Sequence, residues 1–216
     1  GLGFDAESKT GAQECGFHGR FPSKRRGLAP QRKRAVPYAS TAFAATGTTL
    51  RMTSGTDGDP RERLSRAFDH YAAHDTAANP AVVGVFRAFL RGHADAFERG
   101  CVPGHFTGSA WLVSADGERV LLTHHRKLNL WLQPGGHADG DADLARVALR
   151  EAEEETGLRE LRVEPGIYDL DRHRIPARPG EPEHWHDDVR DVVRAGEDER
   201  FIVIQESHAL AWRDIR

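Results

Sequence analysis

A run of acidic residues between Arg150 and Gly157 contains the side chains best suited to chemistry; the segment reads Arg150-Glu151-Ala152-Glu153-Glu154-Glu155-Thr156-Gly157. On an α-helix, Glu151 and Glu155 lie one turn apart on one face, with Glu154 at its edge. Like charges stacked in this way repel, so a helix that needed only stability would not contain them. Mg²⁺ or Mn²⁺ removes this penalty and often bridges a protein carboxylate to a substrate phosphate. The pattern predicts such a metal site; the alternative is a solvated acidic helix face.

The neighbouring residues predict a helix over 143–156 that positions these carboxylates. Asp141 or Asp143 can cap its start, and Gly157 suits a left-handed residue at its end. A loop marked by glycine and proline precedes it, with the sequence Gln133-Pro134-Gly135-Gly136. The buried face of the helix is predicted to contain Leu144, Val147 and Ala148.

The region from Gly136 to Leu158 resembles the Nudix box, a pattern of Gly, five residues, Glu, seven residues and Arg-Glu-apolar-any-Glu-Glu-any-Gly-apolar. Its second half is matched in order by Arg150, Glu151, Ala152, Glu154, Glu155, Gly157 and Leu158. The first glutamate of the pattern falls on Ala142, which departs from the family. The resemblance extends over 104–214. It implies an α/β fold, a Nudix-type α/β/α sandwich with a mixed, curved sheet, preceded by a helical hairpin.

The same resemblance implies metal-dependent hydrolysis of a diphosphate linkage by attack of water on phosphorus. Glu151 and Glu155 would bind Mg²⁺ or Mn²⁺, assisted by Glu154 and by the backbone carbonyl of Gly135. Arg150 would pair with a carboxylate of the helix and hold it in place. The substrate would be a small nucleoside diphosphate derivative.

Further candidates for catalysis and substrate binding lie outside the carboxylate run. The candidates for the general base are Glu154, Glu199 and Glu206, and the sequence does not decide between them. The basic stretch His124-His125-Arg126-Lys127 could face substrate phosphates or form a solvated strand end. A tryptophan before the glycine loop could stack on a substrate ring or anchor the core. The substrate-binding candidates are therefore Arg126, Lys127, Trp131 and Gly136.

Four of the twelve histidines stand at positions where they could meet. His184 and His186 lie two residues apart, on the same side of a predicted strand. His137 directly follows the glycine loop, and His105 begins the first predicted strand. Their alternative role is to line the pocket and hydrogen-bond to the substrate or to each other.

These positions also resemble isopentenyl-diphosphate isomerase, which shares the Nudix scaffold. Its patterns His-x-x-x-Ser-x-Trp-Leu, Cys-Gly-His and Glu-x-Glu are similar to the stretches that begin at His105, Gly135 and His184. The resemblance implies that His105, His137, His184 and His186 form a second metal site. Four imidazoles would favour Zn²⁺, Mn²⁺ or Fe²⁺ over Mg²⁺. Isomerisation itself is disfavoured, because the family's catalytic cysteine falls on Gly135 and Cys101 lies outside the loop.

Hydrophobic periodicity predicts the remaining elements. Two helices are expected before residue 100, the second capped by Asn79-Pro80. They should pack against the main domain; a dimer surface is the alternative. Strands are predicted at 106–114, 118–124, 161–169, 184–194 and 200–205, with an Asp116-Gly117 hairpin turn and a Pro176–Pro182 loop. The family's usual C-terminal helix is expected to be missing or cut short after Trp212.

Composition sets the domain organisation and excludes some partners. Residues 1–56 are predicted to be a disordered basic head, 57–100 a helical hairpin extension and 101–216 the Nudix hydrolase domain. Residues 1–51 contain nine Lys/Arg and three Asp/Glu, which leaves 21 basic and 30 acidic residues for the body. An acidic body argues against nucleic-acid binding, and no apolar run reaches membrane-spanning length. A transit-like peptide is the alternative for the head.

The two cysteines form no disulfide framework, which favours a cytoplasmic location. Three functions are compared: a Nudix hydrolase, an isomerase of allylic diphosphates, and a non-catalytic module that senses a nucleotide. A homodimer is an open expectation.

Overall fold

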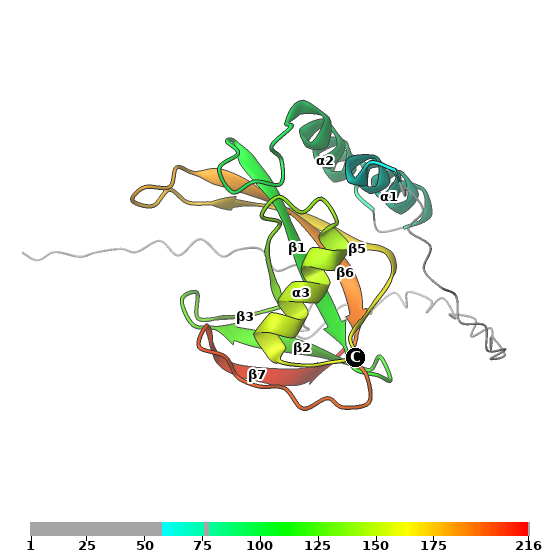
Figure 1. The fold of residues 1–216 in the computed structure, drawn as a ribbon, viewed down its shortest axis with the longest axis vertical. Helices are drawn as coiled ribbons and strands as arrows, with labels where there is room; N and C mark the ends of the chain where they lie inside the picture. The colour runs from blue at the N-terminus through cyan, green and yellow to red at the C-terminus, as the bar shows by residue number, and fades with distance from the viewer. Residues whose placement is uncertain (1–57, 76–77, 216) are drawn as a thin grey trace, which may run out of the picture. The chain divides into compact units, whose positions relative to one another are not determined.

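The computed structural model describes residues 58–75 and 78–215, so the predicted basic head lies outside the described residues. The elements follow one another along the chain (Figure 1) as α1 Pro60–His74, α2 Pro80–Gly92, β1 Gly104–Val113, β2 Arg119–His125, β3 Leu130–Leu132, β4 Gly135–His137, α3 Leu144–Thr156, β5 Arg162–Ile175, β6 His184–Arg194 and β7 Ser207–Asp214. No helix within these ranges is both long and apolar enough to cross a membrane.

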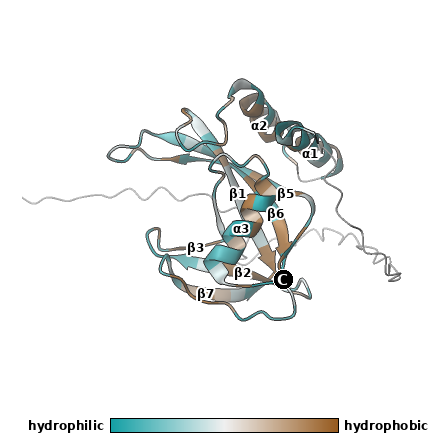
Figure 2. Ribbon diagram, viewed as in Figure 1, coloured by the Kyte–Doolittle hydropathy of each residue, from teal (hydrophilic) through white to brown (hydrophobic). Residues whose placement is uncertain are grey.

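The strands form one mixed sheet with β1 at its centre. The order is β3-β2-β1-β6-β5, while β4 pairs with β1 and β7 pairs with β2. β1 and β6 run parallel, and the other pairs are antiparallel. The α3 helix crosses β1 (Figure 1), and hydrophilic and hydrophobic residues alternate along it (Figure 2), as expected for a helix with one face on a sheet. The predicted mixed sheet with helices is confirmed.

The helices begin and end where side chains and glycine satisfy their free backbone groups. Asp59 and Asn79 cap α1 and α2, and a proline follows each cap. Asp143 accepts a hydrogen bond from the Arg146 backbone N–H at the start of α3. Gly157 ends α3 with φ 69°, a left-handed conformation that suits glycine. Of the two cap candidates for α3, Asp143 therefore takes this role.

Two hydrophobic clusters hold the helices on the sheet. In the first, Phe106 of β1 is fully buried and contacts the rings of Phe68, Phe86, Phe89 and Phe97. The apolar stripe of α2 is thus packed against the main domain rather than left free. The second cluster lies under α3 and β2, and its fully buried members include Ala110, Leu112, Leu121, Ala148, Ala152 and Val193.

Three predictions about the strands are wrong. Residues 200–205 form no strand; the last strand is β7, antiparallel to β2. Ile202 is 64% exposed, and its backbone N–H donates to Thr156 O at 2.7 Å, so this apolar run completes the end of α3. The predicted glycine loop contains β4, which pairs with β1 through Ser109↔Gly135. The prediction of 161–169 also ended too early, since β5 continues to residue 175.

Gly108 of β1 sets how closely α3 approaches the sheet. A Cβ at this position would lie 2.8 Å from the backbone oxygen of Leu144 and 3.0 Å from Val147 Cβ. We expect Gly108→Ala to lower the free energy of unfolding by about 1–3 kcal/mol, because the helix must shift. Denaturant unfolding measures this change. Gly84→Ala is the control: nothing lies within 4 Å of the added Cβ, and alanine favours a helix. Equal stability of both variants would contradict this packing.

Asp191 of β6 makes the stability depend on pH. Its side chain is buried, and burial, followed by the charges of Asp143 and Asp188, raises its pKa to about 7. The folded protein thus keeps a proton that the unfolded chain releases near pH 4, so stability falls as pH rises from about 4 to 7. At about 1.4 kcal/mol per pKa unit, we expect a loss of roughly 2–4 kcal/mol.

The Asp191→Asn variant should lack this part of the pH dependence and be more stable than the wild type at pH 8. Unfolding curves between pH 4 and 8 measure the difference, with the exposed Asp214→Asn as control. An unchanged pH slope in Asp191→Asn would show that this carboxyl titrates normally.

Candidate active site

Glu155 and Glu151 of α3 point toward the glycine backbone of β4. The Gly135 N–H donates to Glu155 Oε1 at 3.0 Å, and the Thr123 hydroxyl of β2 also donates to this carboxylate. Gly136 packs against Glu151, since a Cβ there would lie 2.5 Å from its carboxyl group. Both carboxylates are half-buried. The structure therefore brings together four residues that the sequence predicts for the site.

Arg150 links the carboxylate helix to β4. One of its terminal nitrogens donates to Glu151 Oε1 at 2.9 Å and to the backbone oxygen of His137 at 3.0 Å. The predicted pairing with a helix carboxylate is therefore present, with Glu151 as the partner. The guanidinium holds both the carboxylate and the end of β4 at fixed positions.

The electrostatics of the two carboxylates suit a divalent cation. Burial, together with the nearby charges of Glu151 and Glu206, raises the pKa of Glu155 to about 7. Burial also raises the pKa of Glu151, although Arg150 opposes this. Clustered, partly desolvated carboxylates are hard oxygen ligands that Mg²⁺ or Mn²⁺ would stabilise in the charged form. The residues therefore fit the metal that the pattern predicts.

The other acidic candidates occupy different places. Glu154 is exposed on α3. Glu206, just before β7, is also exposed, and it lies near enough to Glu155 to affect its pKa. Glu199 instead accepts from Arg119 at 2.7 Å and from the Ala115 backbone N–H at 3.1 Å. It is bound at the turn between β1 and β2.

Ala142, where the family pattern has its first glutamate, packs against the first hydrophobic cluster. Two aspartates that precede Ala142 are paired with arginines. Arg99 binds Asp139, with 2.7 Å between Nη2 and Oδ2, and Arg146 binds Asp141, with 2.6 Å between Nη2 and Oδ1. Each of these two aspartates is thus held by an arginine of its own.

The candidates for substrate binding lie in different places. Arg126 and Lys127 are exposed after β2. The Arg126 backbone N–H donates to Glu206 O at 2.9 Å, which places this basic pair beside an acidic candidate. Trp131 of β3 stacks on His124, with ring centroids 5.0 Å apart, and the Arg213 guanidinium lies over its ring. These contacts attach β3 to β2 and β7, while stacking of this tryptophan on a substrate ring stays a prediction.

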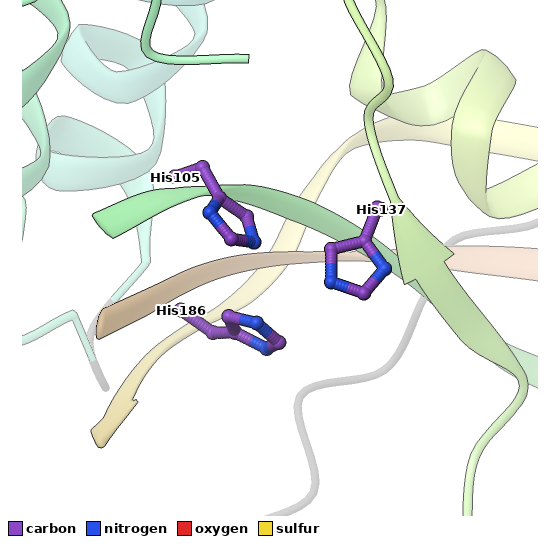
Figure 3. Close-up of side chains that lie close together, drawn as sticks. All are labelled: His105, His137 and His186. Atoms are coloured by element: carbon purple, nitrogen blue, oxygen red, sulfur yellow. The ribbon is translucent and has the colours of Figure 1, made fainter. Parts of the chain in front are cut away.

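The four predicted histidines come together at the other end of β4. His105 and His186 are register partners in β1 and β6, and His137 follows the two glycines of β4. Figure 3 shows these three rings turned toward one another, and their ligand nitrogens all lie within 4.8 Å of each other. The ring centroids of His105 and His184 are 5.0 Å apart. Strand pairing thus gathers residues that are far apart in the sequence.

Burial keeps three of these imidazoles, those of His105, His137 and His186, uncharged. Burial and the neighbouring histidines together lower the pKa of His105 to about 4 and that of His186 to about 2. The pKa of His137 is also lowered, first by burial and then by Arg99. Neither ring nitrogen of His105 has a hydrogen-bond partner among the described residues. An unsatisfied buried polar group costs about 1–3 kcal/mol, so this histidine is unusual.

Sequence analysis did not identify two residues that contact the candidate site. Thr123 donates to Glu155, but nothing in a strand sequence marks a threonine that faces a distant helix. His173 of β5 lies beyond the predicted end of its strand, and its ring centroid is 5.4 Å from that of His186. Its Nδ1 is 3.0 Å from Asp171 Oδ2. A correct strand end at 175 would have placed His173 opposite His186.

Comparisons with known proteins relate the chain to the NUDIX domain. A family model described as NUDIX domain matches residues 105–213. One curated relative is the m7GpppN-mRNA hydrolase NUDT17 of Xenopus laevis, 44% identical over 57 residues. The match covers 24% of this chain and only 19% of that relative.

Similar solved structures include a NUDIX-family hydrolase from Clostridium perfringens, with 23% identity and TM-score 0.39, covering 51% of this chain and 81% of that one. A C. elegans Ap4A hydrolase complex has 16% identity and TM-score 0.41, covering 50% and 79%. A UDP-X diphosphatase has 17% identity and TM-score 0.40, covering 70% and 78%. The family match spans half of the chain and contains the carboxylate helix, and the chain belongs to the NUDIX domain family.

Proposed function

We propose that the protein hydrolyses a diphosphate linkage in a nucleoside diphosphate derivative, by attack of water on phosphorus. One observation carries this proposal: Glu151 and Glu155 are half-buried against the glycines of β4, where a cation and a diphosphate can meet. Membership of the NUDIX domain family supports it. The name of the Xenopus relative, an m7GpppN-mRNA hydrolase, also describes a substrate with a nucleotide phosphate chain.

In this proposal, Glu151 and Glu155 bind Mg²⁺ or Mn²⁺, with Glu154 and the Gly135 carbonyl as further ligands. When bound, such an ion offsets charge on diphosphate oxygens and activates water. Arg150 keeps Glu151 in position through the hydrogen bond at 2.9 Å. The raised pKa of Glu155 supports a metal at this position. Burial beside other carboxylates destabilises the charged form of Glu155, and a bound cation would stabilise that form.

Other side chains of the protein would accept the proton and bind the phosphates. Glu206 and Glu154 are the candidates for accepting a proton from the attacking water, and both are exposed to solvent. Arg126 and Lys127 would bind phosphate oxygens, because they are exposed beside Glu206. The acidic body of the protein favours a small-molecule substrate over a long nucleic acid.

Isomerisation of an allylic diphosphate is the weaker alternative. Gly135 cannot be replaced by cysteine without a shift, since a Cβ there would lie 2.3 Å from Ser109 Oγ. Cys101 is buried, and burial, together with Asp95, raises the pKa of its thiol to about 11. A thiol of this kind is a poor acid or nucleophile at neutral pH.

The other alternative is a module that senses a nucleotide and does not hydrolyse it. Ala142 favours this alternative, because it stands where the family pattern has its first glutamate.

We expect Glu155→Gln to lower kcat on the order of 100-fold or more, the scale of losing one preorganised charged group in an active site. Steady-state hydrolysis measures this, with Mg²⁺ or Mn²⁺ and a panel of nucleoside diphosphate derivatives, capped RNA and isopentenyl diphosphate. Glu153→Gln is the matched control, because Glu153 lies on the same helix but on another face. Circular dichroism checks that both variants fold.

The panel separates the three functions. Release of phosphate or nucleotide supports hydrolysis, double-bond migration supports isomerisation, and binding without turnover supports sensing. Full activity of Glu155→Gln would remove this carboxylate from the site.

Gly136→Ala tests how the backbone of β4 positions Glu151. The added methyl group would press on the Glu151 carboxyl group, so the carboxylate must move away from β4. We expect the Mg²⁺ concentration for half-maximal activity to rise by about 10-fold or more, the usual effect of disturbing groups that orient a metal ligand. Gly100→Ala is the control, since nothing lies within 4 Å of its added Cβ. An unchanged metal dependence would mean that Glu151 is not a ligand.

A further inference from the structure

We propose that His105, His137, His184 and His186 bind one transition-metal ion, best matched by Zn²⁺, at a site separate from the carboxylates of α3. The site is built on strands β1, β4 and β6, which hydrogen-bond to one another. Ligand nitrogens of His105, His137 and His186 lie within 4.8 Å of each other, and Figure 3 shows the rings facing a common centre. Three rings from three paired strands therefore converge on one point.

His105 gives independent evidence that a ligand belongs there. Its side chain is only 1% exposed, and neither ring nitrogen has a hydrogen-bond partner among the described residues. Its ring faces three other imidazoles, with centroids 4.8 Å from His186, 5.0 Å from His184 and 5.1 Å from His137. A cation at the centre would bind a nitrogen that otherwise has no partner.

His184 is oriented as a metal ligand usually is. Its Nδ1 lies 2.9 Å from the backbone oxygen of Pro182, so this nitrogen donates a hydrogen bond and leaves the lone pair on Nε2 free. The Nε2 atoms of His184 and His186 are 3.3 Å apart. Two nitrogens bound to one tetrahedral Zn²⁺ at about 2.0–2.1 Å are separated by about 3.3 Å. The ligand nitrogens of His105 and His137 lie within 4.8 Å of each other and of a His186 nitrogen, so their rings would rotate to bind the same ion.

The surroundings accept a positive charge. Arg99, the nearby cation that lowers the pKa of His137, is paired with Asp139 at 2.7 Å. Glu181 lies at the rim, with 3.6 Å between its Oε1 and His184 Nε2. An all-imidazole centre selects Zn²⁺, Fe²⁺, Co²⁺ or Ni²⁺ over Mg²⁺, whereas the carboxylates of α3 prefer Mg²⁺ or Mn²⁺. The two sites therefore differ in the ions that they take.

The test uses the full chain, purified without a histidine tag or nickel resin. Elemental analysis of the purified protein, and titration of metal-depleted protein with Co²⁺ followed by visible absorption, measure metal binding. We expect one ion per chain in the wild type and less than about a tenth of that occupancy in His137→Ala and His186→Ala. A hundred-fold excess of Zn²⁺ over its Kd should raise the Tm of the wild type by roughly 5–10 °C and leave these variants unchanged.

Two controls make the outcome specific. His70 and His74 of α1 are exposed, and their rings stack with centroids 4.1 Å apart, so the double alanine variant removes a surface histidine pair. This variant and Glu155→Gln should keep the full Zn²⁺ content, the latter while losing hydrolysis. The proposal is overturned by a wild type that neither contains nor binds stoichiometric metal. Metal retained in folded His137→Ala and His186→Ala, or lost in the His70/His74 variant, would also overturn it.

Discussion

The structure depends on the close contact between the carboxylate face of α3 and the backbone of β4. Gly135 donates its backbone N–H to Glu155 and lies so close to β1 that a Cβ there would meet Ser109. Gly136 leaves room for Glu151, because a Cβ at that position would meet the Glu151 carboxyl group. Gly108 allows the same closeness between α3 and β1. Glycines on the sheet thus bring two half-buried carboxylates together, at the expense of electrostatic repulsion that a divalent cation would relieve.

The short strand β4 connects this centre to the histidine cluster. Its two glycines face the carboxylates, while the next residue, His137, places its ring among the other histidines and its backbone oxygen on Arg150. One strand of three residues therefore has carboxylate oxygens on one side and imidazole nitrogens at its end. The two proposed metal sites would differ in the ions that they prefer.

Features with a local period could be predicted from the sequence, whereas long-range contacts could not. The spacing of Glu151 and Glu155 predicts a shared face because the helix period is fixed. The partner strand of His137 and the contact between Thr123 and Glu155 depend on sheet pairing, which no local pattern encodes. The apolar run at 200–205 resembled a strand, but the backbone of Ile202 is used to end α3. The homodimer and the role of residues 1–56 stay predictions.

The most direct test of the central claim is a crystal structure with Mn²⁺ and a non-hydrolysable nucleoside diphosphate analogue, analysed by anomalous scattering. The account predicts a manganese peak bound by carboxylate oxygens of Glu151 and Glu155, with diphosphate oxygens of the analogue on the same ion. A metal and analogue bound elsewhere, with both carboxylates free of any ion, would contradict it.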